Sequence, residues 1–414
     1  MYTILKLTFV PLLSLFIFIL GSGLFTTLVT VRLHNAGVNP LMIGAMTGCY
    51  YAGLAYGSFQ IERFILRVGH IRAFAAFASL LSVISILHGI FFNTWFWLLL
   101  RFFGGFATAG VFIVIESWLL SAGNIDIRGQ ILALYMISLY AAQALGQFMI
   151  NLSDPNTLTL FALTAMLSSL AVIPLSLTKS QSPELSEPSS LSLKDLLKAS
   201  ASGVFGSFCS GLLLGAVYGL LPLIIMQKTG DTADVSLFMA SVIFGGMILQ
   251  FPIGKLSDRI ERRLVLLILA IFTAAVSILF IFGSYSIHLA YLLSFILGGL
   301  SFTLYPVSIS HACDSLNAKD IVSGTQGLLL AYSIGATIGP FIAPLFIHAI
   351  GSNGLFYYLA LVSAVLALYL IWRRVVVQPT PQEESFVAMP QTTPVTAELD
   401  PRSETEESKS SPKN

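Results

Sequence analysis

The sequence predicts an all-α membrane protein with twelve transmembrane helices, arranged as two pseudo-symmetric halves of six helices each. Composition is the first reason, because 56% of the 414 residues are hydrophobic and the mean hydropathy is +0.86. The second is the regular recurrence of apolar runs of about 20 residues, each long enough to cross the hydrocarbon core of a bilayer as a helix. A soluble fold could not bury this much apolar surface, so we expect the chain to lie in a lipid bilayer.

The apolar runs give the boundaries of the predicted helices. The first run continues to Val31 without a small-residue cleavage site, which favours a retained helix over a secretory signal peptide. Polar or Gly/Pro-rich turns separate the runs that follow. The predicted spans are centred on residues 7–31, 41–61, 72–92, 95–119, 130–151, 157–177, 202–226, 236–253, 264–284, 287–310, 323–349 and 354–372.

The positive charges predict the orientation in the membrane. With the N-terminus in the cytoplasm, fifteen Lys and Arg residues lie on the cytoplasmic side, and only Arg32, Arg101 and Lys228 lie on or near the outer side. This imbalance is the one that the positive-inside rule describes. We therefore expect a multi-pass protein of the bacterial cytoplasmic (inner) membrane with both termini in the cytoplasm.

Two polar segments divide the chain. Residues 178–200 are rich in Ser, Pro and charge, and Ser192 and Asp195 have the spacing of a capping box for a short surface helix. After residue 375 the chain is rich in Pro, Ser, Thr and Glu, which predicts disorder. The predicted organisation is an N-terminal six-helix half (1–177), a cytoplasmic linker (178–200), a C-terminal six-helix half (201–374) and a disordered cytoplasmic tail (375–414).

The two halves repeat each other weakly. A shift of 192 residues places Gly53 on Gly245 and Arg67 on Arg259, and a shift of 194 aligns GGFATAGVFIVIES (104–117) with GGLSFTLYPVSISH (298–311). Internal duplication of six-helix units is typical of secondary transporters whose substrate site lies between the halves near the bilayer midplane. We expect such a site here.

Charge is concentrated in one loop. Residues 254–263 read GKLSDRIERR, so six of ten positions are charged in a chain that is 10% charged. On the predicted topology this is the cytoplasmic turn between spans eight and nine, and RVGHIR (67–72) is its counterpart between spans two and three. Acidic and Arg side chains there can bridge helix ends and release them when the halves rock. We predict a cytoplasmic gate with these members: Gly254, Asp258, Arg259 and Arg263, with Arg67, Gly69 and Arg72. The alternative for Lys255, Arg262 and Arg263 is that basic residues lie at cytoplasmic helix ends in any case.

GKLSDRIERR resembles the loop signature G-x-L-x-D-R-x-G-R-R of the major facilitator superfamily, with Glu261 where a glycine is expected. The first-half copy has Leu66 where the acid is expected. LRFFGGFATAG (100–110) resembles the fourth-helix pattern of this superfamily, in which an Arg precedes small residues. GSGLFTTLVTVRL, RVGHIRAFA, ESWL and RGQ are similar to its YcaD-like bacterial branch. The resemblance covers residues 1 to about 375 and implies the superfamily fold.

One signature of the superfamily is missing. Its drug/proton antiporters carry a G-x-x-x-G-P type pattern in the fifth helix, whereas the fifth span here reads LYMISLYAAQALGQ and has Gln147 after Gly146. The sequence therefore favours transport of a defined small solute over multidrug export.

Ionisable groups inside a membrane are costly and are candidates for function. Glu116 is the one carboxylate well within a predicted helix of the first half, close to the cytoplasmic edge of span four. Three interpretations stay open: it pairs with Arg63, Arg67 or Arg128 in the gate, it binds a proton, or it is an interfacial carboxylate. A carboxylate that exchanges between an Arg and a proton would couple gating to proton entry.

Three further residues are candidates for coupling or for substrate charge. Arg101 either snorkels to the outer interface or is held within the protein, beside small residues such as Gly104 and Gly105, to meet an anionic group or tune a proton site. Arg32 has the same alternatives, and together the two weakly favour an anionic or zwitterionic solute. His311, near the repeat equivalent of Glu116, is either a structural residue or a proton carrier.

Polar residues near the midpoints of predicted helices are candidates for a central cavity, because polar groups at that depth must face protein or water. They are Tyr140, Gln143, Tyr218, Tyr305 and Tyr332.

The motif content argues against an enzyme. We find no P-loop, no H-E-x-x-H, no Cys/His metal spacing and no G-x-S-x-G after a strand, so we expect neither metal nor cofactor, and ATP-driven pumping by this chain alone is excluded. The net charge of +1 suggests no nucleic-acid partner. Cys49, Cys209 and Cys313 lie far apart and suit unpaired buried thiols.

Together these observations predict a monomeric secondary active transporter that moves a small solute by alternating access, with protons as the coupling ion. One alternative is a drug or toxin efflux antiporter. Another, from a different class, is a membrane receptor or scaffold that transports nothing and uses the acidic tail as its output.

Overall fold

The computed structural model describes residues 2–121, 125–177, 193–282, 286–317, 320–377 and 385–402, and every regular element in these ranges is helical. The first half contains α1 (Tyr2–Asn35), α2 (Pro40–Val68), α3 (His70–Ile90), α4 (Thr94–Ser121), α5 (Ile125–Phe148), the 3-10 turn η1 (Met149–Leu152), α6 (Thr159–Leu170) and α7 (Val172–Ser176). The second half contains α8 (Leu193–Thr229), α9 (Thr232–Ser257), α10 (Arg262–Phe282), α11 (Ile287–Cys313), α12 (Ile321–Ile350) and α13 (Gly354–Val376), followed by the 3-10 helix η3 (Pro394–Leu399).

The helices match the predicted spans. Within the described residues, eleven segments are long and apolar enough to cross a membrane, and α6 and α7 together form one of them. The remaining predicted span is α2, which is 29 residues long but rich in Gly and Tyr, so its hydropathy is lower. Because α2 packs against α4 and α12, much of its surface faces protein and not lipid. The prediction of an all-α fold with two six-helix halves is confirmed.

The two halves have the same internal packing. In the first half α1 packs on α5, α2 on α4 and α3 on α6, and in the second half α8 packs on α12, α9 on α11 and α10 on α13. Two glycines show that the same helix crossing occurs in both halves. A Cβ added at Gly53 would lie 1.8 Å from the carbonyl oxygen of Phe102, and one added at Gly245 would lie 1.8 Å from that of Phe295. Equivalent helix crossings therefore depend on glycines that the sequence repeat places at equivalent positions.

The start of the second half is marked by a kink. Ser200 has φ −146° and ψ 72° inside α8, which separates a short helical segment from the long span that follows. In the short segment Leu196 is buried against Gly327 of α12, whereas Leu197 is exposed. Residues 178–192, which include most of the predicted linker, lie outside the described part of the chain.

The halves meet along α1–α8, α2–α12 and α5–α9. We call the side with the α2–α3 turn and the α9–α10 loop the motif face, and the other side the opposite face. Contacts at the opposite face are close: Thr30 Oγ1 donates to the carbonyl oxygen of Gly219 at 3.2 Å, and Asn151 Nδ2 donates to Ser236 Oγ at 2.9 Å. The opposite face is therefore closed.

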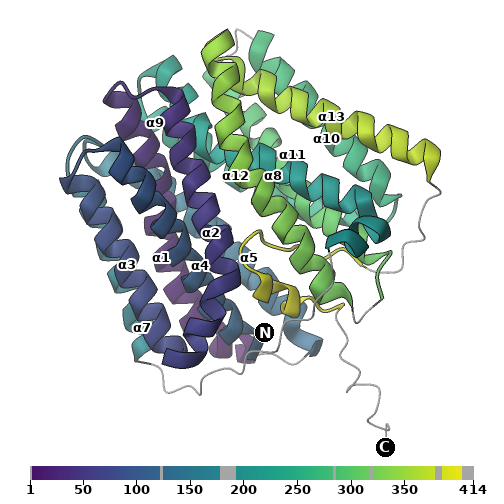
Figure 1. Ribbon diagram of the computed structural model, residues 1–414, viewed down its shortest axis with the longest axis horizontal. Helices are drawn as coiled ribbons and strands as arrows, with labels where there is room; N and C mark the ends of the chain where they lie inside the picture. Colours follow the sequence, from purple (N-terminus) through teal and green to yellow (C-terminus); the bar gives the residue numbers. More distant parts are fainter. Residues whose placement is uncertain are drawn as a thin grey trace, which may run out of the picture.

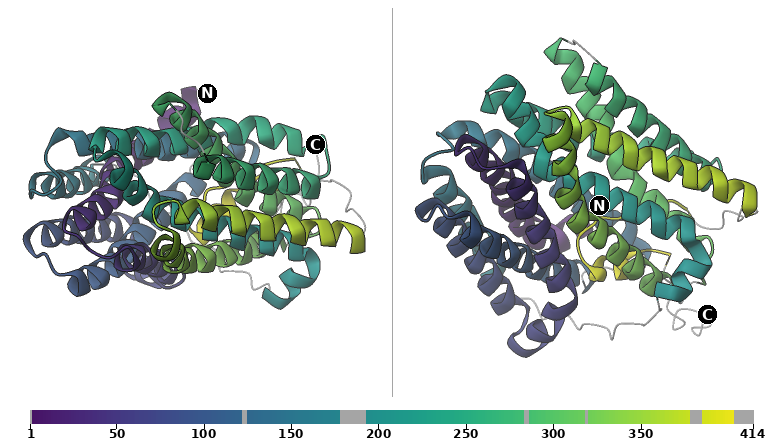
Figure 2. Two further views of the ribbon diagram at one scale, coloured as in Figure 1. Left: turned by 90° about the horizontal axis from the view of Figure 1, so that it is seen from above. Right: turned by 45° about the horizontal axis from the view of Figure 1, so that its top comes forward.

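At the motif face residues 385–402 lie between the halves. Figures 1 and 2 show this segment in yellow, between the purple-to-blue helices of the first half and the green helices of the second. Met389 and Leu399 are 1% and 0% exposed. The expectation of disorder after residue 375 does not hold for this segment, because its apolar side chains pack between the halves and its Thr and Gln side chains find polar partners there. Residues 378–384 and 403–414 lie outside the described residues.

Candidate functional site

A pocket lies between the two halves. Its lining residues come from α1, α2, α4, α5, α8 and α12 and from the C-terminal segment: Ile19, Ser22, Gly23, Thr26, Thr47, Tyr50, Tyr51, Leu54, Phe112, Leu139, Tyr140, Gln143, Tyr218, Tyr332, Gln391 and Thr392. Five of these residues are tyrosines. Six are Ser, Thr or Gln, and two of those six, Gln391 and Thr392, come from the C-terminal segment. No described lining residue is charged. The pocket thus combines aromatic faces with neutral hydrogen-bonding groups.

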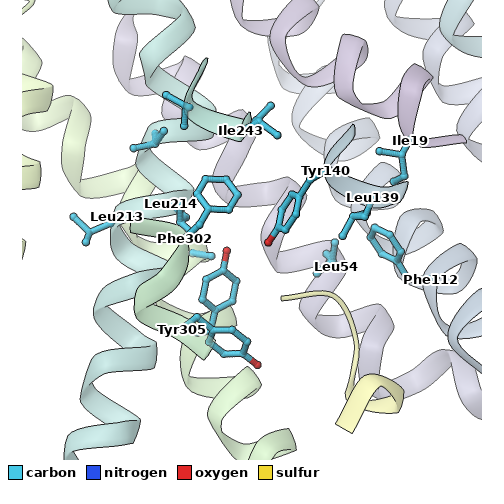
Figure 3. Packing of buried hydrophobic residues seen from close by; sticks show 14 of the residues in the cluster. Ile19, Leu54, Phe112, Leu139, Tyr140, Leu213, Leu214, Ile243, Phe302 and Tyr305 are labelled. Atoms are coloured by element: carbon cyan, nitrogen blue, oxygen red, sulfur yellow. The ribbon is translucent and has the colours of Figure 1, made fainter. Parts of the chain in front are cut away.

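Two aromatic contacts to Phe302 lie beside this pocket, and one of them crosses between the halves. Tyr140 of α5 packs edge-on against Phe302 of α11 with ring centroids 5.5 Å apart, and Tyr218 of α8 packs against the same ring at 5.7 Å. Figure 3 shows Tyr140 facing Phe302 and Tyr305 across the space between the halves. Phe302 therefore supports one tyrosine from each half of the pocket.

Four of the five predicted cavity residues line the pocket: Tyr140, Gln143, Tyr218 and Tyr332. Tyr305 does not line it and instead packs against Tyr332, with ring centroids 5.1 Å apart. The sequence analysis missed Tyr50 and Tyr51 of α2. The same depth criterion could have found them, because both lie at the middle of the predicted span 41–61.

Arg101 is held within the protein. Its side chain is 2% exposed, and its guanidinium lies over the rings of Tyr50 at 4.6 Å and Phe25 at 5.5 Å. Such cation–π contacts compensate part of the cost of burying the charge. Arg101 does not line the pocket but contacts the ring of Tyr50, which does.

Arg32 lies away from the pocket. Its Nη1 donates to Asn156 Oδ1 at 2.8 Å in an exposed contact, and its guanidinium is 5.3 Å from the ring of Phe92. Since neither Arg32 nor Arg101 lines the pocket, the expectation of an anionic solute finds no support in the lining.

Glu116 of α4 is fully buried near the motif face. Tyr135 of α5 donates to its Oε1 at 2.7 Å, and the hydroxyls of Thr392 and Thr393 donate to Oε1 and Oε2. Among the described residues no ion pair involves Glu116. The predicted pairing with Arg63, Arg67 or Arg128 is therefore not formed in this structure: the first two are exposed, and the third donates to the carbonyl oxygen of Glu398 at 3.0 Å.

The centre of the second-half motif is Arg262, which the sequence analysis did not select. Its side chain is 1% exposed and donates to Asp258 Oδ1 at 3.2 Å, Asp314 Oδ1 at 2.6 Å and the carbonyl oxygen of Ser310 at 2.6 Å. The expected partner of Asp258, Arg259, is exposed. The reason is the short loop: α9 ends at Ser257 and α10 begins at Arg262, so only residues 258–261 separate the two helices and the Arg262 side chain reaches Asp258.

Other members of the predicted gate fasten helices of the second half. Arg263 Nη1 donates to the carbonyl oxygens of Arg373 at 3.3 Å and Val377 at 2.9 Å, which links the start of α10 to the end of α13. Gly254 packs against the ring of Phe386, and an added Cβ would lie 2.2 Å from it. These contacts hold the second half together and bring the C-terminal segment onto the motif.

The first-half copy of the motif is simpler. Gly69 has φ +84° and connects α2 to α3, a conformation that favours glycine. Arg67 and Arg72 are exposed, and no ion pair among the described residues includes either of them. His311 is buried in α11, three positions before Asp314.

Comparison with known proteins gives matches over most of the chain. The family model of the Major Facilitator Superfamily matches residues 12–201 and 203–405. An uncharacterized MFS-type transporter of Yersinia enterocolitica is 32% identical over 91% of this chain and 97% of its own length. The uncharacterized MFS-type transporter YcaD of Escherichia coli is 29% identical over 86% of this chain and 93% of its own. These matches confirm the resemblance drawn from the loop motif.

Solved structures share the fold. The nucleoside transporter NupG superposes with a TM-score of 0.70 and 16% identity, covering 90% of this chain and 99% of that one. A bacterial homolog of the human lysosomal transporter Spinster, in an inward-facing and occupied conformation, gives a TM-score of 0.71 at 14% identity, covering 91% and 97%.

Proposed function

Since the chain belongs to the major facilitator superfamily, we propose that it is a secondary active transporter that carries a small, uncharged, polar solute through the inner membrane of a bacterium. The observation that carries this proposal is the pocket between the halves. In two-half transporters the substrate site lies at that interface, and rocking of the halves exposes it to each side in turn.

The lining of the pocket favours an uncharged solute with a ring. Tyr50, Tyr51, Tyr140, Tyr218 and Tyr332 offer flat apolar faces, while hydroxyl and amide groups offer neutral hydrogen bonds. A charged solute would lose its hydration without meeting an opposite charge in the lining, which is costly. A solute such as a nucleoside or a sugar would instead exchange its hydrogen bonds with water for hydrogen bonds with the lining.

The mechanism that we propose is alternating access from an inward-open state. The motif face is cytoplasmic on the topology that the positive charges predict. In that orientation the close contacts at the opposite face form the outer gate, and the pocket communicates with the cytoplasm through the space that holds residues 385–402.

A binding screen tests the proposal. The purified full chain would be heated with uncharged ring compounds (nucleosides and monosaccharides) and with charged compounds (amino acids, carboxylates and organic cations), because a ligand of the folded state raises the melting temperature. The expected result is stabilisation by an uncharged ring compound, followed by uptake of that compound into proteoliposomes. Stabilisation only by charged compounds would reject the proposed substrate class, and binding without uptake would reject transport.

The pocket predicts a specific loss of affinity. Gln143→Leu keeps the size of the side chain but removes its hydrogen bonds to solute, so the Kd of the compound found in the screen should rise by about tenfold or more. The control is Gln250→Leu, because Gln250 is buried in α9 but does not line the pocket. Isothermal titration of both variants checks the prediction, and equal affinities for the two would place the solute elsewhere.

We propose Glu116 as the proton-binding group. Glutamine at this position keeps the shape of the side chain and can accept the hydrogen bond from Tyr135, but it cannot exchange a proton. Glu116→Gln should therefore abolish accumulation driven by a pH gradient in proteoliposomes, while exchange of labelled for unlabelled solute continues. The control is Glu261→Gln, which changes a carboxylate that pairs with Arg374 at the same face. Undiminished accumulation by Glu116→Gln would exclude this role.

A further inference from the structure

Residues 385–402 form a folded contact with both halves and not a loose tail. Val395 and Leu399 are 6% and 0% exposed, and η3 lies against α4, α5 and α12. Figure 3 shows the yellow backbone of this segment entering beside Leu54 of the pocket. A segment with so few apolar residues can be buried here because it completes a space between existing helices and needs no core of its own.

Its contacts to the first half converge on α4 and α5. The hydroxyls of Thr392 and Thr393 donate to the buried carboxylate of Glu116, and Arg128 of α5 donates to the carbonyl oxygen of Glu398. These bonds satisfy a carboxylate for which the described residues provide no cation.

Its contacts to the second half begin at the α9–α10 loop, at Asp258 and Gly254. The backbone N–H of Phe386 donates to Asp258 Oδ1 at 2.7 Å, and the ring of Phe386 fills the space above Gly254. Farther along, Arg402 pairs with Asp400 at 2.6 Å and donates to Ser310 Oγ at 3.1 Å. The segment thus connects the motif of one half to the carboxylate of the other.

We propose that the space between the halves at the motif face is a binding site for the chain's own segment 385–402, which acts as a tethered plug. Closing this face would require the helix ends that now contact the plug to approach one another, as their counterparts do at the opposite face. The plug occupies that volume, so it must leave before the face can close. Gln391 and Thr392 also line the pocket, so a solute that passes through this face meets the plug.

The tether keeps the site between the halves occupied by the plug and still allows the plug to be displaced. Residues 377–384 are all that separate the segment from the end of α13, and a short tether gives an effective concentration on the order of millimolar. A weak intrinsic affinity is then enough to keep the site filled, while a competing ligand or partner can still shift the equilibrium. Only the consequence for transport rests on the proposed function, because the binding itself can be measured without a substrate.

The test is cysteine labelling of the purified full chain with a charged maleimide, corrected for the rate of the parent protein. Thr396→Cys places a thiol in the plug at a position that is 2% exposed, and Lys198→Cys provides a reference at a side chain that is 81% exposed. We expect the thiol at 396 to react at least about tenfold more slowly than the reference. Equal rates would overturn the inference, whether or not the chain transports any solute.

A second pair of variants tests whether the plug holds the conformation. Phe386→Ala combined with Arg402→Ala removes two anchors, and Ser385→Ala, at an exposed position, is the matched control. The anchor variant should raise the labelling rate at 396. It should also raise labelling of Ser236→Cys, a buried position at the closed opposite face, because the halves can then rock. Unchanged labelling at 236 while 396 becomes accessible would overturn the proposal that the plug controls the closing of the motif face. If the thiol at 396 reacts slowly but the chain moves no solute, the proposed function is rejected and the proposal of a plug is upheld.

Discussion

Replacement of Arg262 by alanine is expected to lower the free energy of unfolding by about 3–5 kcal/mol, the range for breaking a buried ion pair by removing one partner. The reason is the environment of the guanidinium, which is 1% exposed and lies 2.6 Å from the carboxylate of Asp314, itself 2% exposed. Alanine would leave that carboxylate in the interior without its guanidinium. Asp258 contributes less, because its side chain is 36% exposed and can be hydrated.

The measurement is equilibrium unfolding of the full chain in mixed micelles. Arg259→Ala is the matched control, since it removes the same kind of charge from the same loop but at an exposed position, and it should change stability by no more than about 0.5 kcal/mol. Arg262→Lys should recover only part of the loss, because one ammonium group cannot reproduce the geometry of the guanidinium fork. If the two alanine variants were equally stable, the ion pair with Asp314 would not hold this face of the second half together.

The Arg262 result would also distinguish two roles of the motif: stabilising the second half, and contacting the C-terminal segment. Arg262, Asp258 and Asp314 all belong to the second half, so their contacts keep α9, α10 and α11 in one rigid body. Outside the six helices, this loop contacts the C-terminal segment: the backbone N–H of Phe386 donates to Asp258, and the ring of Phe386 packs against Gly254. The motif therefore stabilises a half, and the C-terminal segment connects that half to the other.

The helices could be predicted from the sequence because each has its own signal, an apolar run of the length of a bilayer. The partner of Asp258 could not be predicted in the same way. Arg259, Arg262 and Arg263 are near it in sequence, and which of them faces Asp258 depends on where α9 ends and α10 begins. A boundary shift of one residue rotates a side chain by about 100° around the helix, which is beyond what hydropathy can locate.

The plug was missed for a different reason. Polar composition predicts disorder when a segment must bury its own core, and residues 385–402 need none, because the two halves supply the apolar and polar surfaces that they contact. For the same reason the sequence analysis looked for an Arg partner of Glu116 and not for Thr392 and Thr393. These hydrogen-bond partners are 276 and 277 positions away along the chain. The tyrosines at helix midpoints were predictable, because a buried polar group at that depth must face protein or a cavity.

The other large effect is expected at adjacent glycines of α4. A Cβ added at Gly105 would lie 1.9 Å from the carbonyl oxygen of Tyr50 and 2.8 Å from the amide nitrogen of Leu54, both backbone atoms of α2. At Gly104 the nearest atoms to an added Cβ are side-chain carbons of Ile84 and Leu81 at 3.8 Å, which is ordinary contact. The same substitution by alanine should thus have opposite consequences at neighbouring positions.

Gly105→Ala should lower the free energy of unfolding by about 3 kcal/mol or more, because the clash is with backbone and the two helices must separate. Gly104→Ala should be neutral or should stabilise the chain by up to about 1 kcal/mol through its better helix propensity. Unfolding in mixed micelles measures both, and equal stabilities would show that α2 and α4 do not cross as closely as described.

The effect at Gly105 should extend to the pocket and to the other half. Tyr50 lines the pocket, so pushing α2 away from α4 moves its ring and should weaken binding of the solute together with stability. Gly298 of α11 makes the same kind of contact as Gly105, because an added Cβ there would lie 1.9 Å from the carbonyl oxygen of Val242 in α9. Gly298→Ala should therefore destabilise the chain as much as Gly105→Ala does. A large loss at one glycine and none at the other would mean that only one of the two crossings depends on close backbone contact, and that the duplicated halves have diverged in how they are packed.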